Sequence, residues 1–344
     1  MSEIAVTVYC LAYNHEKYIG QCLDSLVNQK VSFPYQIIVH DDASTDGTRA
    51  IIEDYVKKYP EIIRPIYEKE NQYSKKTGIV KNIIAPLVIG KYVAVCEGDD
   101  YWISSEKLQK QYDVMEAHPQ CGLCLHRTKE VTETGADTGL EYPKQVYETG
   151  ILKAEDLFNS IEPRMFHTTS FFFRGDAWRA YYKDTPVYRK VCHVGDVPYL
   201  LYFGSNYQTY QINEVMSCYR RGGLSSFTNK RFEVNEARLL QHHNSITNTY
   251  RLFDQETNGV YHWICVRRIS KNLYAKCALQ GNFKELLSSE SKDYLRDLPV
   301  AKRVSVYVGI VFPNLIKELY VKHLREFEQN ERARWAGNGG GGLS

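Results

Sequence analysis

The sequence lacks several features that would assign a chain of 344 residues to a class at once. No uninterrupted apolar run reaches the length of a membrane-spanning helix. The N-terminus, MSEIAVTVYC, has no basic segment followed by a long apolar core, so we expect no signal peptide and a cytoplasmic protein. The formal net charge is only +2, so nothing indicates bulk nucleic-acid binding, and no nucleic acid partner is expected.

Zinc-type cysteine spacing is also missing. Cys121 and Cys124 form a C-x-x-C pair, but no second cysteine or histidine pair follows at the spacing of a zinc finger. Both lie in the strand-like segment CGLCLHR, so we interpret them as small buried hydrophobic residues. No Walker sequence is present, and no G-x-G-x-x-G sequence joins a predicted strand to a helix.

What the sequence does contain is a regular alternation of strand and helix patterns in its first hundred residues. Apolar, β-branched runs predict strands at 4–12, 35–40, 62–68 and 91–97. Apolar residues at helical period predict helices at 15–29, 45–60 and 79–89, the first with Asn14 as its N-cap. Pro65 indicates that the third strand lies near a sheet edge. This alternation predicts an α/β fold, a Rossmann-like, mostly parallel sheet flanked by helices.

Three polar clusters follow predicted strands. AYN follows the first strand, DDASTDGT the second and EGDD the fourth. Ligands of such sheets bind beyond the carboxyl ends of the strands, so we expect the three clusters to converge at one edge.

In order and spacing, CLAYNHEKYIGQCLDSLVNQ, IIVHDDASTDGT and VAVCEGDDYW resemble the N-terminal half of inverting family 2 glycosyltransferases with the GT-A fold. The resemblance covers residues 4–125 closely and 165–226 more loosely. It implies a GT-A domain over 1–228. The residue pattern, not the resemblance, predicts a helical C-terminal region at 229–335 and a flexible, glycine-rich tail at 336–344. The resemblance also implies a nucleotide-sugar donor, a UDP-sugar by preference, and a role in the synthesis of cell-surface polysaccharide.

The acidic cluster is the DxD-type motif of that family. By resemblance, Asp99 is the metal ligand, and Glu97 stands where the family has an Asp that reaches the ribose or the metal. Asp100 either orients the acceptor or caps the next helix. Mn²⁺ or Mg²⁺ would suit these oxygen ligands and the charge of a diphosphate. The alternative for the whole cluster is a solvated turn that caps a helix.

Further donor contacts are expected from the other two clusters. The resemblance assigns Asp41 or Asp42 to the pyrimidine or ribose, whereas Asp46 and Thr48 are predicted to form a turn that starts a helix. Tyr13 either lies against the base or packs in the core.

Residues downstream of the acidic cluster complete the predicted site. Asp196 begins an apolar helix with Pro198 in its first turn; by resemblance it is the general base, and helix capping is the alternative. Arg220 and Arg221 are predicted to bind the donor diphosphate, next to a loop that contains Gly222, Gly223, Ser225 and Ser226.

The remaining segments bear on the acceptor, a glycan or a polyprenyl-linked saccharide. Residues 127–165 are polar and turn-rich and predict a mobile acceptor-side loop, followed by a strand and a helix at 166–178. The C-terminal third is helical by pattern. Within it, 304–327 predicts either a core-packing helix pair or a peripheral contact with the inner face of the cytoplasmic membrane.

Two other classes of function remain open. A nucleotidyltransferase could use the same fold and metal site, although it usually needs a basic glycine-rich loop after the first strand, where AYNHEKY stands. A non-catalytic nucleotide-sugar or glycan-binding module would have no need for both an acidic cluster and a downstream Asp.

Overall fold

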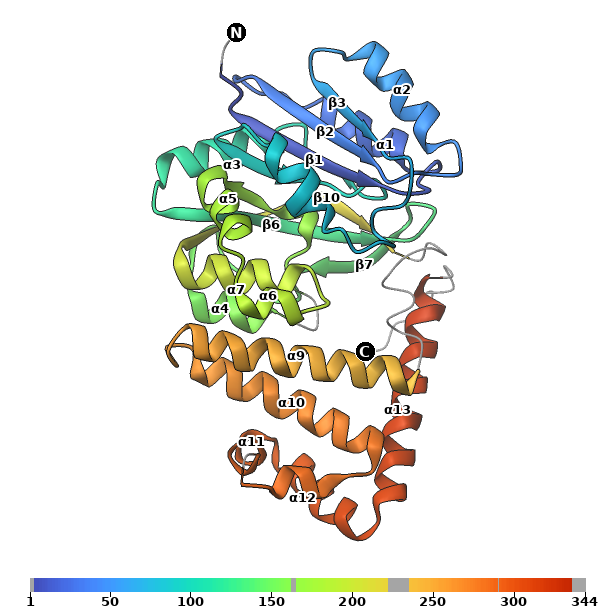
Figure 1. Cartoon of the computed structure of the whole chain (residues 1–344), viewed down its shortest axis with the longest axis vertical. Helices are drawn as coiled ribbons and strands as arrows, with labels where there is room; N and C mark the ends of the chain where they lie inside the picture. Colours follow the sequence, from blue (N-terminus) through green and yellow to red (C-terminus); the bar gives the residue numbers. More distant parts are fainter. Residues whose placement is uncertain (1–2, 162–164, 222–234, 290, 336–344) are drawn as a thin grey trace. The chain divides into compact units, whose positions relative to one another are not determined.

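The computed structural model describes residues 3–161, 165–221, 235–289 and 291–335. The chain divides into two compact units, residues 1–185 with 202–220 and residues 186–201 with 221–344, which are described in turn (Figure 1). The predicted domain boundary at 228, the glycine-serine loop at 222–226 and the predicted tail at 336–344 lie outside the described residues.

The first unit is built on a ten-stranded sheet. Four neighbouring strands, in the order β3-β2-β1-β4, are all parallel, and β6 and β10 form a second parallel pair. β9 joins β4 to β6, and β5, β7 and β8 extend the sheet, all of them antiparallel. The strands are β1 (Val6–Ala12), β2 (Tyr35–Asp41), β3 (Ile63–Tyr67), β4 (Tyr92–Val95), β5 (Tyr101–Trp102), β6 (Cys121–Val131), β7 (Asp137–Tyr142), β8 (Gly150–Leu152), β9 (Phe172–Arg174) and β10 (Gln208–Arg220).

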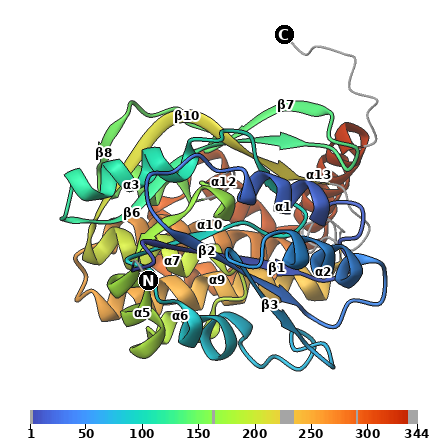
Figure 2. The same ribbon diagram turned by 90° about the horizontal axis from the view of Figure 1, so that it is seen from above.

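Helices cover both faces of the parallel half, which is why β1 and β2 read as continuous apolar runs. Alternate residues of β1 enter one core with α1 (Ile19–Val27), α2 (Thr48–Lys58) and α3 (Lys107–Ala117). On the other face, the ring of Tyr9 lies 5.9 Å from that of Trp178 on α5 (Gly175–Lys183). Figure 2 shows α1 and α3 on one side of these strands and α5 on the other.

The four predicted N-terminal strands are confirmed, and β3, with Pro65, is an edge strand. The segment predicted as a helix at 79–89 forms a π-helical turn (Val80–Ile84) and a 3₁₀ turn (Ala85–Leu87). The prediction that Asn14 caps α1 is wrong. Asn14 has a left-handed backbone (φ 55°), and its Oδ1 accepts a hydrogen bond from the Thr45 N–H at 2.8 Å.

The prediction of a mobile loop over 127–165 is also wrong for the residues described. This segment completes β6, forms the β6–β7 hairpin, and continues into β8 and α4 (Ala154–Ser160). Two polar residues of β6, Thr128 and Glu130, are buried with partners: Thr128 Oγ1 lies 2.9 Å from Ser217 Oγ, and the Tyr142 hydroxyl donates to Glu130 Oε2 at 2.6 Å. The predicted strand and helix at 166–178 are confirmed as β9 and α5, after a 3₁₀ turn at Thr168–Ser170.

The second unit is helical in its described residues. α9 and α10 pack along each other, and α6 packs on α9. The helices are α6 (Val187–Val191), α7 (Asp196–Asn206, which continues into the first unit), α9 (Glu236–Glu256), α10 (His262–Gln280), α11 (Lys292–Asp297), α12 (Val300–Val311) and α13 (Pro313–Trp335), with a 3₁₀ turn at Phe283–Leu287.

The segment 304–327 belongs to α12 and α13. α12 buries Val306, and its Ser305 hydroxyl lies 2.9 Å from the Tyr274 hydroxyl of α10, so one face packs against the unit as the core-packing interpretation predicted. Among the described residues, no helix combines the length and the apolarity needed to cross a bilayer.

Cys121 and Cys124 are buried, as predicted. All nine cysteines are free and buried, and burial raises the pKa of the Cys121 thiol to about 11 and that of the Cys124 thiol to about 12. Thiols held protonated in this way are poor metal ligands and nucleophiles, so a packing role for both residues follows.

Candidate active site at the carboxyl edge of the sheet

The loops that follow β1, β2 and β4 meet at one edge, as predicted. The Asn14 N–H donates to Ser44 Oγ at 3.0 Å, and the His15 N–H donates to Thr48 Oγ1 at 2.8 Å, which joins the β1–α1 loop to the β2–α2 loop. The Gly98 N–H donates to the Leu11 carbonyl at 2.9 Å, which joins the β4–β5 loop to β1. These hydrogen bonds hold the three loops together at the base of the candidate site.

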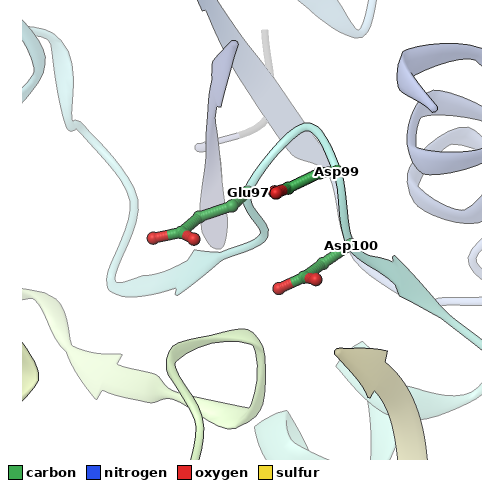
Figure 3. Close-up of side chains that lie close together, drawn as sticks. All are labelled: Glu97, Asp99 and Asp100. Carbon is green, nitrogen blue, oxygen red and sulfur yellow. The ribbon is translucent and has the colours of Figure 1, made fainter. Parts of the chain in front are cut away.

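Three carboxylates lie together on the β4–β5 loop. Glu97, Asp99 and Asp100 each place an oxygen within 4.8 Å of the other two. Their side chains project in the same general direction from the loop, with Asp100 at the start of β5 (Figure 3). Glu97 is exposed, Asp99 is half-buried and Asp100 is 1% exposed, so the cluster runs from solvent into the protein.

Asp100 is the most constrained of the three. Its Oδ1 accepts a hydrogen bond from the Arg220 N–H at 2.8 Å. Its buried Oδ2, which has no hydrogen-bond partner among the described residues, lies 3.6 Å from His167 Nδ1. Burial raises the pKa of the Asp100 carboxyl well above its usual range, and the charges of Asp99 and Glu97 raise it further. Asp100 does not cap a helix, because α3 begins only at Lys107.

This donor set fits a hard divalent cation. Mn²⁺ and Mg²⁺ prefer oxygen ligands, and the three carboxylates supply them at a spacing that one ion could bridge. Bound there, a cation would compensate the mutual repulsion that raises the pKa of Asp100. The alternative of a solvated turn does not account for a carboxylate that is 1% exposed.

The predicted donor residues Asp41 and Asp42, where β2 meets the β2–α2 loop, lie next to the linked loops. Asp41 is buried; its Oδ1 accepts from the Ser44 N–H at 3.2 Å, and its Oδ2 lies 3.5 Å from Arg49 Nε. Asp42, also buried, accepts hydrogen bonds from the N–H groups of Gln72 (2.6 Å) and Tyr73 (3.0 Å). Both carboxylates therefore order the loops around the site.

Tyr13 and the STDGT turn can be placed as well. Tyr13 is 40% exposed, which contradicts the core-packing alternative and leaves its ring accessible at this edge. Asp46 accepts hydrogen bonds from both the Thr48 N–H (3.0 Å) and the Thr48 hydroxyl (2.6 Å) at the start of α2, which confirms the predicted turn.

The two arginines that follow one another in sequence have different surroundings. Arg220, at the end of β10, is 6% exposed and donates to the Asp99 carbonyl, to two carbonyls of the β6–β7 turn and to Gln21. Arg221 belongs to the second unit, where its Nη2 lies 3.5 Å from Glu331 Oε2 of α13.

Asp196 is the first residue of α7, as predicted, and Pro198 lies in the first turn of that helix. The N-terminus of a helix stabilises an ionised carboxylate, which is the form that a general base requires. Asp196 belongs to the second unit, whereas the three clustered carboxylates belong to the first.

The structure adds site residues that sequence reasoning did not single out. His15 Nε2 lies 4.0 Å from Asp99 Oδ2, and His167 faces Asp100. His15 directly follows the AYN segment, so its position after β1 could have identified it as a site residue. His167 carries no such local signal, and Gln21 of α1 joins the site only through its bond to Arg220, 199 residues away.

The first unit therefore combines a parallel half-sheet with an acidic loop at its carboxyl edge, where α/β sheets bind their ligands. The sequence profile of glycosyl transferase family 2 matches residues 7–179, and the chain belongs to this family. The matched range contains all three clustered carboxylates and the Asp41–Asp42 pair.

Known relatives and solved structures agree with this assignment. An uncharacterised protein of Mycobacterium tuberculosis is 37% identical over 140 residues, which are 40% of this chain and 39% of the relative. Poly(ribitol-phosphate) beta-glucosyltransferase of Bacillus spizizenii is 33% identical over 131 residues, 38% of this chain and 20% of the relative. The matches thus span less than half the length of these curated relatives.

The structure of S. aureus TarS in complex with UDP-GlcNAc is 16% identical, with a TM-score of 0.61, and the alignment covers 94% of this chain and 92% of that chain. The likeness confirms the predicted GT-A fold with a helical C-terminal region.

Proposed function

We propose that the protein is an inverting, metal-dependent glycosyltransferase that moves a sugar from a UDP-sugar to a glycan or polyprenyl-linked saccharide in cell-surface polysaccharide synthesis. The observation that carries this proposal is the carboxylate cluster of Glu97, Asp99 and Asp100 at the carboxyl edge of the sheet in a family 2 chain. A binding module would not need a cluster that is costly to bury.

Two relatives support the choice of donor and acceptor. TarS binds UDP-GlcNAc, and the Bacillus relative is named for glucosyl transfer to poly(ribitol phosphate). The first supports a UDP-sugar donor, and the second supports a glycan polymer or its lipid-linked precursor as acceptor.

Asp99, with Glu97 beside it, would hold a divalent cation, Mn²⁺ or Mg²⁺, which when bound neutralises negative charge on the donor diphosphate. Tyr13 would lie along the uracil ring, and Asp41 or Asp42 would accept hydrogen bonds from the base or ribose. Arg221 would contribute charge toward the diphosphate, and Asp100 would orient the acceptor from its buried position.

Asp196 would act as the general base. Its carboxylate takes the proton of the acceptor hydroxyl while that oxygen attacks the anomeric carbon from the face opposite the diphosphate. The anomeric C–O bond breaks, both bonding electrons leave with UDP, and the configuration of the transferred sugar inverts.

A panel of UDP-sugars, tested with Mn²⁺ for hydrolysis and for thermal stabilisation, examines this proposal directly. A bound donor raises the melting temperature by mass action, so one UDP-sugar should stand out in both assays. A folded protein that neither binds nor hydrolyses any sugar nucleotide would overturn it. Release of pyrophosphate from UTP and a sugar phosphate would favour a nucleotidyltransferase instead.

We also propose a peripheral membrane contact within 304–327, on the inner face of the cytoplasmic membrane. α12, α13 and the residue that joins them expose large apolar side chains three or four positions apart within each helix: Val304, Tyr307, Val308, Val311, Phe312, Leu315 and Leu319. Such a stripe beside Lys317 and Lys322 has the pattern of an interfacial helix. It would bring the enzyme to a lipid-linked acceptor.

A further inference from the structure

Arg220 joins the carboxylate cluster to the rest of the first unit. Its side chain is 6% exposed and lies between α1, β5 and the β6–β7 turn. The guanidinium carbon stands 4.8 Å from the centre of the Tyr18 ring and 5.4 Å from that of Tyr101. A side chain enclosed in this way has few alternative positions, so the groups that bind to it are held as well.

The hydrogen bonds of Arg220 go to neutral oxygens on three sides. Nε donates to the Asp99 carbonyl at 3.0 Å, and Nη2 donates to Gln21 Oε1 at 2.6 Å. Nη1 donates to the carbonyls of Thr132 (3.4 Å) and Glu133 (2.8 Å). These bonds occupy four of the five guanidinium N–H groups, which leaves little capacity for the donor diphosphate.

The main chain of the same residue holds the adjacent carboxylate, because the Arg220 N–H donates to Asp100 Oδ1 at 2.8 Å. One residue therefore binds the carbonyl of Asp99 and the side chain of Asp100. Arg220 thus holds both the peptide group that joins Asp99 to Asp100 and the side chain of Asp100.

We propose that Arg220 is a positioning residue for the metal-binding loop, and that it acts on the cation through Asp99 and Asp100 rather than by contacting the donor. This inference rests on the metal site of the proposed function. It reassigns Arg220 from the diphosphate contact that the sequence predicted. Groups that orient metal ligands typically change metal affinity by about 10- to 100-fold when they are replaced.

The charge and the hydrogen bonds of Arg220 should change Mn²⁺ affinity in opposite directions, so a titration can tell them apart. A guanidinium close to the site repels a cation, so removing the charge alone should tighten Mn²⁺ binding. Loss of loop geometry should instead weaken it. Arg220→Lys keeps the charge but replaces the planar fork with one ammonium that cannot span the same oxygens. Arg220→Met removes both the charge and the hydrogen bonds.

The experiment is Mn²⁺ titration followed by electron paramagnetic resonance, without nucleotide, on wild type, both Arg220 variants and Arg174→Lys. Arg174 is a matched control: it donates to the carbonyls of Met115, His118 and Cys121 and stands over Tyr92, so its replacement tests general loss of packing. Thermal melting of each protein establishes that it is folded.

We expect Arg220→Lys to weaken Mn²⁺ binding by at least ~10-fold and Arg174→Lys to leave it unchanged. Unchanged Mn²⁺ affinity in Arg220→Lys, or tighter binding in Arg220→Met, would overturn the positioning role. A separate UDP titration of the same four proteins covers the donor site: intact Mn²⁺ affinity with lost UDP affinity in the Arg220 variants would return Arg220 to that site. If wild type itself failed to bind Mn²⁺, the proposed metal site would be overturned, and this inference with it.

Discussion

The acidic edge of the first unit and the α12–α13 stripe of the second depart from ordinary protein surfaces in opposite directions. At the edge, charged groups such as Asp100 and Arg220 are buried. In the stripe, large apolar side chains such as Val311 and Phe312 are 67% and 59% exposed. Buried charge and exposed apolar area both cost stability, so each marks a surface that we expect a ligand or a membrane to complete.

Of all the substitutions, Asp99→Asn at the acidic edge should have the largest effect on activity. The change removes the charge of the predicted metal ligand from the loop and should abolish Mn²⁺-dependent transfer while the protein stays folded. Turnover and Mn²⁺ affinity, measured together, check this. Asp113→Asn, on the exposed face of α3, is the matched control. Near-normal turnover of Asp99→Asn with Mn²⁺ would refute the metal assignment.

Asp196→Asn should lower the transfer rate by at least ~10²-fold, because an amide keeps the shape and capping ability of the residue but cannot accept the proton. UDP-sugar affinity should survive. Asp293→Asn, which also stands in the first turn of a helix in the second unit, controls for effects on helix stability. A loss of donor affinity in proportion to the rate would place Asp196 in the donor site.

Val311→Glu combined with Phe312→Glu should reduce co-sedimentation with anionic vesicles by about tenfold, since it replaces apolar contact area with repelled charge. Val260→Glu is the control, because Val260 is 68% exposed but lies outside α12 and α13. Equal sedimentation of the two variants and wild type would argue against a membrane contact through this stripe.

Lys107 is another buried ionisable group in the first unit, and no functional role is proposed for it. Burial lowers the pKa of this lysine to about 7; its Nζ lies 3.9 Å from the centre of the Trp102 ring and donates to Gln111 Oε1 at 2.7 Å. Cys96, Cys124 and His126 are the titratable groups around it.

Between about pH 7 and the unfolded value of 10.5, the unfolded chain binds a proton at this lysine that the folded chain does not. The free energy of unfolding should therefore rise with pH over that window, by up to about 1.4 kcal/mol per pH unit. Lys107→Met should lose this slope, whereas Lys58→Met on exposed α2 should keep it. Urea unfolding at pH 7, 8 and 9 measures the difference, and equal slopes in all three proteins would contradict the assignment.

Much of the fold was predictable, because β1 to β4 and the helices α1 and α2 have strong local patterns. The polar stretch 127–165 was misread for a physical reason. Thr128 and Glu130 look like loop residues in sequence, yet Ser217 and Tyr142 supply their hydrogen bonds inside the protein. Polarity indicates exposure only where no distant partner satisfies it.

The sequence by itself determined the α/β alternation, the placement of Glu97, Asp99 and Asp100 directly after a buried strand, and the helix that starts at Asp196. These are local properties, set by the period of apolar residues and by the residues that end each run. Tertiary structure alone decided that Asp100 is buried and that Arg220, 120 residues away, binds the loop. That contact depends on β10 pairing with β5 and β6, and no pattern within one segment encodes which distant strands pair.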